Sequence, residues 1–441
     1  MQYIKCMSEV IDIISKKRDG LSLTSREIQF IIDGIVNNSI PDYQASAFLM
    51  AAVINGFDHN ETLALTKAYM HSGDIIDLSD IPGIKVDKHS TGGVGDKTTI
   101  VLAPLVAAAG CKAVKISGKG MGHTGGTVDK FAAFTGMSME LDSQTLLNNV
   151  KKIGVGISGQ TANLVPADKI IYALRDVTAT IPSIPLITAS IMSKKLASGA
   201  DAIVLDVKTG SGSFMSDFKD SLKLAETMVE IGNAMGRRTV AIISNMEQPL
   251  GRAIGNINEV IEAIEVLKGN GPSDVQEICM VLGAEMMCLS GLAEKEEEAR
   301  RMLEEVIRSG AALDKLRQLV RIQGGDPAMI DDLEMFEKAT GSYELLSSDT
   351  GYLNELEART VGRASMILGA GRETLDSSID MTAGIYLHKK CGDYVRAGDV
   401  LATLENCNPE KLKTASELLR TAYHFSENAK GVPELILRKI G

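Results

Sequence analysis

Two glycine-rich stretches decide how this chain folds: Lys88-His-Ser-Thr-Gly-Gly-Val-Gly-Asp96 and Lys115-Ile-Ser-Gly-Lys-Gly-Met-Gly-His-Thr-Gly-Gly-Thr127. Each continues a short run typical of a β-strand, residues 86–87 in the first case and 113–116 in the second. Because parallel strands present their carboxyl ends at one edge of a sheet, we expect the two loops to share one crevice. Glycine lets backbone N–H groups approach a ligand, while Ser, Thr and Lys add donors and charge. The loops therefore predict an anion site.

The rest of the chain predicts helices followed by an α/β sheet. The N-terminal part contains two capping-box spacings, Thr24 with Glu27 and Asp58 with Glu61, each ahead of a helical pattern. Beyond Lys85, five β-branched runs alternate with helical stretches, which is typical of a largely parallel sheet. These runs are residues 86–87, 113–116, 155–157, 202–207 and 239–244.

These patterns divide the 441 residues into three predicted parts. We expect a discontinuous all-helical domain, a larger α/β domain with a mixed, largely parallel sheet, and a C-terminal α+β module rich in strands. The expected boundaries are 1–76 and 166–197 for the helical domain, 77–165 and 198–340 for the α/β domain, and 341–441 for the module.

Composition excludes several classes of protein. A net charge of -11 and 4% aromatic residues argue against a nucleic-acid partner, which needs a basic face or stacking platforms. The longest apolar run, 100–110, is about half of a ~20-residue membrane span, so we expect no membrane segment. The six cysteines have no metal-site spacing and are expected to be free thiols. We predict a cytoplasmic protein.

Three local patterns have alternative interpretations. Gly120-Met-Gly-His-Thr-Gly125 fits the dinucleotide fingerprint, but the helix expected after it is short for that crossover and the first loop is left unexplained. The first loop is similar to a P-loop, but Asp96 stands where a glycine is needed. Residues 385–404 resemble the hairpin of biotinyl and lipoyl carrier domains. A structural module is favoured there over a modified arm at Lys389 or Lys390.

The motifs together resemble the thymidine and pyrimidine-nucleoside phosphorylase family. The resemblance runs essentially from end to end, and several details are more similar to the broad pyrimidine-nucleoside branch. The matching motifs are Lys88-His-Ser-Thr-Gly-Gly-Val-Gly-Asp96, Ser117-Gly-Lys-Gly-Met-Gly-His-Thr-Gly-Gly-Thr-Val-Asp-Lys130, Ala173-Leu-Arg-Asp-Val-Thr-Ala-Thr180 and Ser190-Ile-Met-Ser-Lys-Lys195.

The resemblance implies reversible phosphorolysis of uridine, thymidine and deoxyuridine: inorganic phosphate attacks C1′ and releases the free base and a pentose 1-phosphate. The implied catalytic residues are His89, Arg175 and Lys194, and Ser190 joins Arg175 and Lys194 in binding the pyrimidine. His123 in the second loop is expected to be structural. The implied phosphate-binding residues are Lys88, His89, Ser90, Thr99, Lys115, Ile116, Ser117 and Thr127.

The broad branch also implies a monovalent cation, expected to be potassium, and no organic cofactor. Lys97 stands where one well-known form of the pattern has Thr. A lysine side chain cannot ligate a cation, so its contribution would come from the backbone carbonyl. The implied ligand set is Gly95, Lys97, Leu250, Ala253 and Glu262.

The resemblance further implies a homodimer, with the N-terminal helices as the expected interface. Phosphate and pyrimidine nucleoside would occupy opposite walls of a cleft between domains, with hinges near residues 76–84 and 153–167. Three alternatives stay open. They are a strict thymidine phosphorylase, a phosphoribosyltransferase of related architecture, and a non-catalytic protein that binds nucleosides or phosphate.

Overall fold

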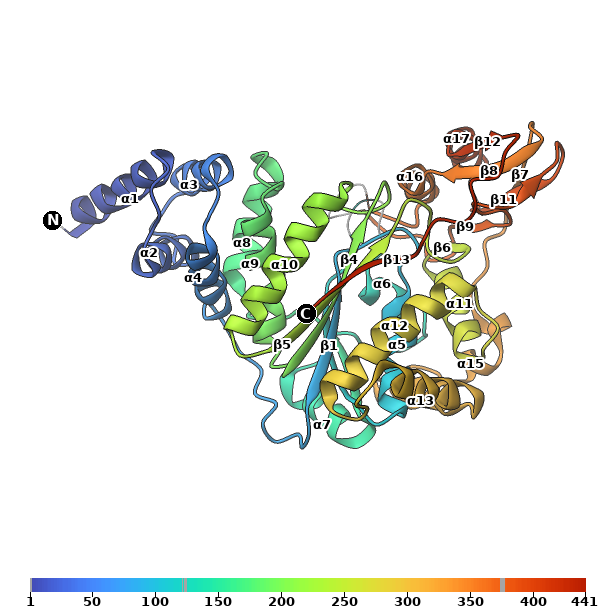
Figure 1. Ribbon diagram of the computed structural model, residues 1–441, viewed down its shortest axis with the longest axis horizontal. Helices are drawn as coiled ribbons and strands as arrows, with labels where there is room; N and C mark the ends of the chain where they lie inside the picture. Colours follow the sequence, from blue (N-terminus) through green and yellow to red (C-terminus); the bar gives the residue numbers. More distant parts are fainter. Residues whose placement is uncertain (1, 121, 123–124, 373–376) are drawn as a thin grey trace.

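A computed structural model describes residues 2–120, 122, 125–372 and 377–441 of the chain. Figure 1 shows a group of helices at one end, a twisted sheet in the centre and a set of short strands at the far end. This is the predicted fold class: a helical domain, an α/β domain and a C-terminal module rich in strands. The first helices are α1 (Gln2–Arg18), α2 (Ser25–Val36), α3 (Asp42–Asn55) and α4 (His59–Met70).

Both predicted capping boxes are present at the N-termini of helices. Thr24 caps α2 and Asp58 caps α4, and in each case the glutamate three residues later bonds back to the cap. Two later helices, α8 (Pro166–Val177) and α9 (Ile184–Ala197), pack against this group. The prediction that a second helical block rejoins the N-terminal helices in space is therefore confirmed.

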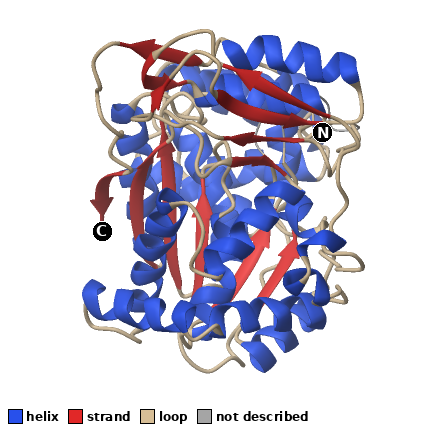
Figure 2. Cartoon of the chain, turned by 90° about the vertical axis from the view of Figure 1, so that its right-hand side faces the viewer, coloured by secondary structure: helices blue, strands red, loops and turns tan. Residues whose placement is uncertain are grey.

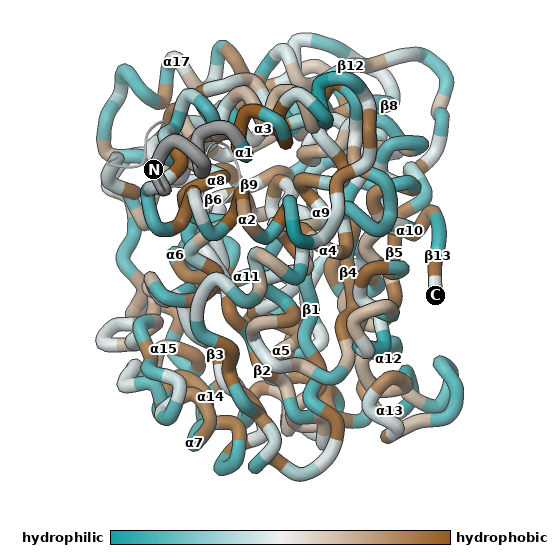
Figure 3. The backbone as a smooth tube through the Cα atoms, turned by 90° about the vertical axis from the view of Figure 1, so that its left-hand side faces the viewer, coloured by the Kyte–Doolittle hydropathy of each residue, from teal (hydrophilic) through white to brown (hydrophobic). Residues whose placement is uncertain are grey.

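The central sheet has six strands in the order β13-β5-β4-β1-β2-β3. All five predicted β-branched runs lie in it and are parallel to their neighbours, while β13 is antiparallel to β5. Every residue of β4 is buried, and Figure 3 shows hydrophobic colour along β3 and β4. The strands are β1 (Lys85–Ser90), β2 (Lys112–Ser117), β3 (Val155–Gly159), β4 (Ala202–Thr209), β5 (Arg238–Asn245) and β13 (Ile436–Ile440).

Helices cover both faces of the sheet, so successive residues of the central strands are buried on both sides. One face packs on α5 and α12, and the other packs on α9 and α10. The remaining elements of this part are α5 (Thr98–Ala108), α6 (Thr127–Phe131), α7 (Ser143–Ile153), α10 (Phe218–Ala234), α11 (Ile257–Leu267), α12 (Ser273–Ser290), α13 (Glu296–Arg308), α14 (Ala311–Ile322), α15 (Ala328–Asp331) and the 3₁₀ turn Leu333–Met335.

The C-terminal module lies over the carboxyl edge of the parallel sheet (Figure 2). Two strand pairings join this end of the chain to the α/β domain: β6 (Ala253–Gly255) pairs with β9 of the module, and β13 returns to the central sheet. Its elements are β7 (Ser342–Leu346), β8 (Gly351–Leu356), α16 (Ala358–Leu368), β9 (Gly384–Leu387), β10 (Tyr394–Val395), β11 (Val400–Glu405), α17 (Pro409–Arg420) and β12 (Tyr423–Ser426).

The hairpin that resembles a carrier domain has a structural role. The Lys390 ammonium is buried and donates to the carbonyls of Pro249 and Gly251 at 2.8 and 3.0 Å. Lys389 forms an ion pair with Asp399 at 3.2 Å. Each side chain has a partner in the fold, which supports the structural interpretation. Among the described helices, none is long and apolar enough to cross a membrane.

A buried ion pair joins α1 to α4 within the helical group. The Lys17 Nζ lies 2.8 Å from Glu61 Oε1, and the two side chains are 3% and 1% exposed. Glu61 also accepts hydrogen bonds from the backbone N–H groups of Leu23 and Asp58. One carboxylate therefore fixes a capping box, a turn and a neighbouring helix together.

Replacing Glu61 with alanine is expected to destabilise this helical group by about 3–5 kcal/mol, because it leaves the buried Lys17 ammonium without a partner. The matched control is Glu27→Ala, which removes the corresponding glutamate of the α2 capping box together with the partner of Lys16. Because that ion pair is partly exposed, this substitution should cost only about 1 kcal/mol. Hydrogen exchange measures the loss in the α4 amides for Glu61→Ala and in the α2 amides for Glu27→Ala, and equal losses would contradict the prediction.

Candidate active site

The two glycine-rich loops lie side by side at the carboxyl edge of the sheet. Strands β1 and β2 are parallel neighbours with Val86 opposite Ala113, so the loops that follow them begin at the same edge. In the first loop Gly92 and Gly95 have φ values of 93° and 77°, which side chains rarely adopt. The Ser90 hydroxyl accepts a hydrogen bond from the Gly92 N–H at 3.2 Å. The expected shared crevice is thus supported by strand order.

The predicted phosphate residues lie at the ends of these strands and at the starts of the following helices. Thr99 lines a small cavity of about 20 Å³ together with Lys88 and Lys115, between α5 and the two strands. His123 lies outside the described residues. Residues Lys88, His89 and Ser90 belong to β1, Lys115, Ile116 and Ser117 to β2, Thr99 to the first turn of α5 and Thr127 to the start of α6.

Two buried lysines carry the charge at this edge. The Lys88 Nζ donates to the Thr98 hydroxyl at 2.5 Å and lies 3.5 Å from Asp206 Oδ2. The Lys115 Nζ donates to the backbone carbonyl of Lys88. Burial, together with the nearby Lys195 ammonium, lowers the pKa of Lys115 to about 7. Lys115 therefore loses its proton easily as long as no anion is bound beside it.

The predicted pyrimidine residues lie on two neighbouring helices. Arg175 belongs to α8 and is 1% exposed, and its guanidinium donates to the carbonyls of Thr180, Ile181 and Leu186 at 3.1, 2.7 and 3.2 Å. Three of its five N–H groups are therefore engaged, two by the segment that joins α8 to α9 and one by the first turn of α9. Arg175 therefore holds the connection between α8 and α9 in place and also puts a positive charge there.

Ser190 and Lys194 lie one turn apart on α9 and face the same side. The Lys194 Nζ is 2.8 Å from Asp168 Oδ2 and 3.4 Å from the Ser190 hydroxyl oxygen. The Tyr69 hydroxyl and Asp168 Oδ1 are buried nearby without a hydrogen-bond partner. Burial and then Asp168 raise the pKa of Tyr69, so its hydroxyl stays protonated. This wall offers both donors and acceptors to a polar ring.

His89 is a partly exposed residue near the end of β1. Burial is the largest influence on its ring, followed by the positive charges of Lys195, Lys115, Lys194 and Lys88. All of them lower the pKa of His89 well below its usual value. The imidazole is therefore neutral at pH 7, and its buried Nε2 has no hydrogen-bond partner. The charges of lysines from β1, β2 and α9 therefore all act on one neutral ring. The Lys195 bonds to Asp87 and to the Ile116 carbonyl place α9 beside the same two strands.

Sequence reasoning missed two residues that hold these walls. Lys195 on α9 is buried and donates to Asp87 Oδ2 at 2.8 Å and to the Ile116 carbonyl at 3.0 Å. Asp168, the partner of Lys194, stands seven residues before Arg175 and so lies on the same face of α8. That spacing was a usable signal for Asp168. Lys195 had none, because its partners are distant in sequence.

A third missed residue connects the second loop to the C-terminal module. The Arg372 guanidinium binds both carboxylate oxygens of Asp129 at 2.7 and 2.9 Å and donates to the Gly120 carbonyl at 3.1 Å. Asp129 also accepts from the Gly120 N–H. The module thus contributes directly to the conformation of a loop in the candidate site.

The residues expected to surround potassium come together around an ammonium group instead. The Lys97 Nζ donates to the carbonyls of Leu250 and Ala253 at 3.1 and 2.8 Å and forms a short ion pair with Glu262. Burial disfavours this charge, but the carboxylates of Glu262 and Glu259 outweigh burial and raise the pKa of Lys97 above its usual value. Only the backbone carbonyl of Lys97 was expected at this position, whereas its side chain also enters the set. As arranged here, the set does not fit an additional cation.

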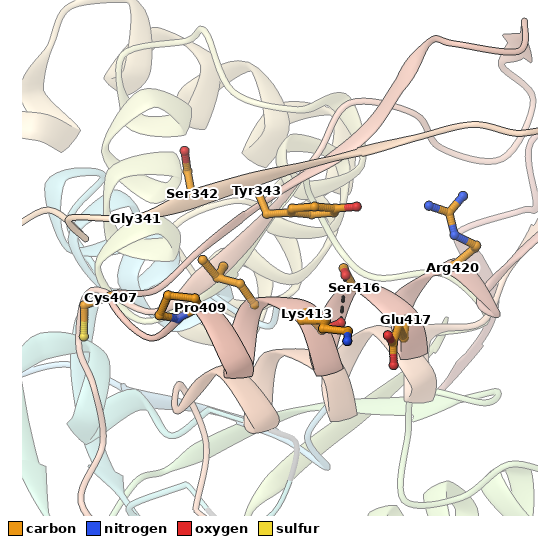
Figure 4. Close-up of a pocket in the computed structure, with 10 residues that line it drawn as sticks. Gly341, Ser342, Tyr343, Cys407, Pro409, Lys413, Ser416, Glu417 and Arg420 are labelled. Atoms are coloured by element: carbon orange, nitrogen blue, oxygen red, sulfur yellow. Dashed lines mark hydrogen bonds between the residues drawn. The ribbon is translucent and has the colours of Figure 1, made fainter.

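A separate surface groove of about 530 Å³ lies in the C-terminal module between β7 and α17. Figure 4 shows Tyr343 lying across it from Lys413 and Glu417 of the helix. Its lining includes none of the predicted phosphate or pyrimidine residues. The groove is therefore distinct from the site at the sheet edge.

Comparisons with known proteins agree with this arrangement. Residues 11–73 match the helical bundle domain of a glycosyl transferase family, and residues 83–313 match the a/b domain of that family. Residues 352–426 match the pyrimidine nucleoside phosphorylase C-terminal domain. An anthranilate phosphoribosyltransferase from Thermus thermophilus is similar in fold, with a TM-score of 0.57 and 17% identity over 71% of this chain and 99% of that one.

Close relatives are similar along nearly the whole chain. The pyrimidine-nucleoside phosphorylase of Geobacillus stearothermophilus is 52% identical over 98% of this chain and 99% of its own length. The pyrimidine-nucleoside phosphorylase of Staphylococcus aureus (strain N315) is 55% identical over 90% of this chain and 92% of its own length. The chain therefore belongs to the pyrimidine-nucleoside phosphorylase family of glycosyltransferases and is an enzyme of the pentosyltransferase class.

Proposed function

We propose that this enzyme catalyses the reversible phosphorolysis of uridine, thymidine and deoxyuridine to the free base and a (deoxy)ribose 1-phosphate. The observation that supports it is the contact between α9 and the sheet edge, where Lys195 donates to Asp87 of β1 and to the Ile116 carbonyl of β2. Lys194 and Ser190, assigned to the pyrimidine, lie on the same helix, and Lys88 and Lys115, assigned to phosphate, lie on the same strands. A protein that binds only one of the two ligands does not need both walls.

In this proposal the sheet edge holds phosphate as the nucleophile. Lys88 and Lys115 supply charge, while Ser90 and Thr127 supply neutral donors beside backbone N–H groups of the loops. The positive end of α5 adds to the field at the anion. The enzyme's contribution to this step is positioning of phosphate in line with the bond from C1′ to the base.

The helical wall receives the leaving base. As the glycosidic bond lengthens, negative charge spreads onto the pyrimidine carbonyl oxygens. Lys194 and the two free N–H groups of Arg175 then interact more strongly with the transition state than with the bound nucleoside. His89, being neutral, acts as a hydrogen-bond partner to the base or phosphate and does not store a proton for it.

The direct test is release of free uracil from uridine in the presence and absence of inorganic phosphate, followed by chromatography. Uracil is expected only with phosphate, and thymidine should give thymine under the same conditions. Release from thymidine and deoxyuridine but not from uridine would favour a strict thymidine phosphorylase. The proposal fails if no base appears from any of the three nucleosides.

Removing the Arg175 guanidinium is expected to slow the reaction. Arg175→Ala should lower kcat/KM on the order of 10²-fold or more, because a cation opposite the developing charge is lost. Arg321→Ala, at an exposed position on α14, is the matched control and should keep normal kinetics. Thermal melting of both variants separates loss of chemistry from loss of the carbonyl contacts. Near-normal kinetics in Arg175→Ala would remove this residue from the site.

The pKa of Lys115 predicts how phosphate binding depends on pH. The charge of Lys115 is present below a pH of about 7 and is lost as the pH rises through that value. The apparent KM for phosphate is therefore expected to rise above that pH. Lys115→Arg keeps its charge and should flatten the rise, whereas Lys112→Arg at the opposite end of β2 should not. Identical profiles for all three proteins would contradict the assignment.

A further inference from the structure

Lys97 is a fully buried cation with a complete set of acceptors. It directly follows the first glycine-rich loop and precedes α5, yet its side chain is 0% exposed. An ammonium group has three N–H donors. In Lys97 these meet the Leu250 carbonyl, the Ala253 carbonyl and the Glu262 carboxylate. Every donor is used, which is uncommon for a lysine and argues for a built site.

The acceptors around Lys97 form a cradle of the kind that holds a monovalent metal ion. Backbone carbonyls can replace the hydration shell of potassium, and a carboxylate adds a compensating charge. The Glu262 carboxylate is itself fixed by the N–H groups of Arg252 and Ala253 at 3.0 and 3.1 Å. A Cβ atom at Gly251 would collide with Glu262 Oε2 and would lie 2.7 Å from the Lys97 Nζ. The cradle is therefore closed around the ammonium nitrogen.

Charge in this region is already balanced. Three buried or largely buried lysines pair one to one with three carboxylates, and the pairs lie on neighbouring segments. An additional cation would bring a fourth positive charge without a fourth carboxylate, which is unfavourable where water is excluded. The pairs are Lys97 with Glu262, Lys130 with Glu259 and Lys390 with Asp274.

We infer that the Lys97 ammonium takes the place of a bound monovalent cation, so that this enzyme folds and functions without potassium. The tethered charge holds the first glycine-rich loop against residues 250–253, the segment that becomes β6 and pairs with the C-terminal module. The inference deepens the proposed function and rests on it only where turnover is measured. Folding and ion binding test it independently of activity.

The experiment compares the wild-type enzyme with the variant K97T, which replaces the ammonium with a hydroxyl. Both are melted in potassium chloride and in tetramethylammonium chloride at equal ionic strength. The wild-type melting midpoint is expected to be the same in the two salts. For K97T the midpoint should be lower in tetramethylammonium and should rise with the logarithm of potassium concentration, because binding then stabilises the folded state. K389T, which removes a partly exposed ion pair, should behave as the wild type.

Crystals soaked in rubidium chloride give a second readout that needs neither turnover nor a melting transition. Anomalous density between Leu250, Ala253 and Glu262 is expected in K97T and not in the wild-type enzyme. Rubidium at that position in the wild type, or a wild-type midpoint that rises specifically with potassium, would overturn the inference. A folded K97T that neither binds rubidium nor responds to potassium would also overturn it. If K97T does not fold in either salt, the two wild-type measurements decide.

Discussion

The ion pair between Lys195 and Asp87 is the contact on which the geometry of the site depends. It is buried, and it joins α9 to β1, two elements that lie far apart in the chain. An unpaired charge there would be costly, so the helix cannot slide or rotate without losing stability. Because Lys194 is the next residue and Ser190 lies on the adjoining turn, fixing Lys195 also fixes where those side chains project. The positions of Ser190 and Lys194, the predicted pyrimidine residues on α9, therefore depend on Lys195, which bonds to the strands that carry the predicted phosphate residues.

The site contains more positive charge than its own carboxylates neutralise. The pKa of Lys115, lowered to about 7, and the low pKa of His89 have the same causes: loss of water around the group and the positive charges of several lysines. Such an arrangement destabilises the protein, and a dianion would relieve it. In the proposed function, the same excess charge favours phosphate binding and keeps His89 neutral. Sites that are shaped for a ligand commonly carry this kind of local cost.

The sequence predicted what depends on local pattern and missed what depends on distant contacts. The five strands and both capping boxes follow from short-range rules, and the membership of the family follows from the loop motifs around Lys88 and Lys115. Lys195 and Arg372 could not be identified, because their partners are brought close only by the fold. The side chain of Lys97 was misjudged for the same reason: the residue type was visible, but the direction of the side chain was not.

The Lys97 side chain supplies the positive charge that the carbonyl groups around it would otherwise need from a bound ion. A cradle of carbonyls needs a positive charge to hold its oxygens together, and a free ion supplies it only when the surrounding concentration is sufficient. A lysine that belongs to the loop supplies the charge at all times, but it must bury its side chain to do so. The backbone then has no need of a side-chain cap from Lys97 at the start of α5, because the Asp96 carboxylate accepts from the Thr98 N–H at 3.2 Å and from its hydroxyl at 2.6 Å. Two neighbouring residues therefore have different roles: Asp96 caps α5, and Lys97 anchors the first glycine-rich loop to residues 250–253.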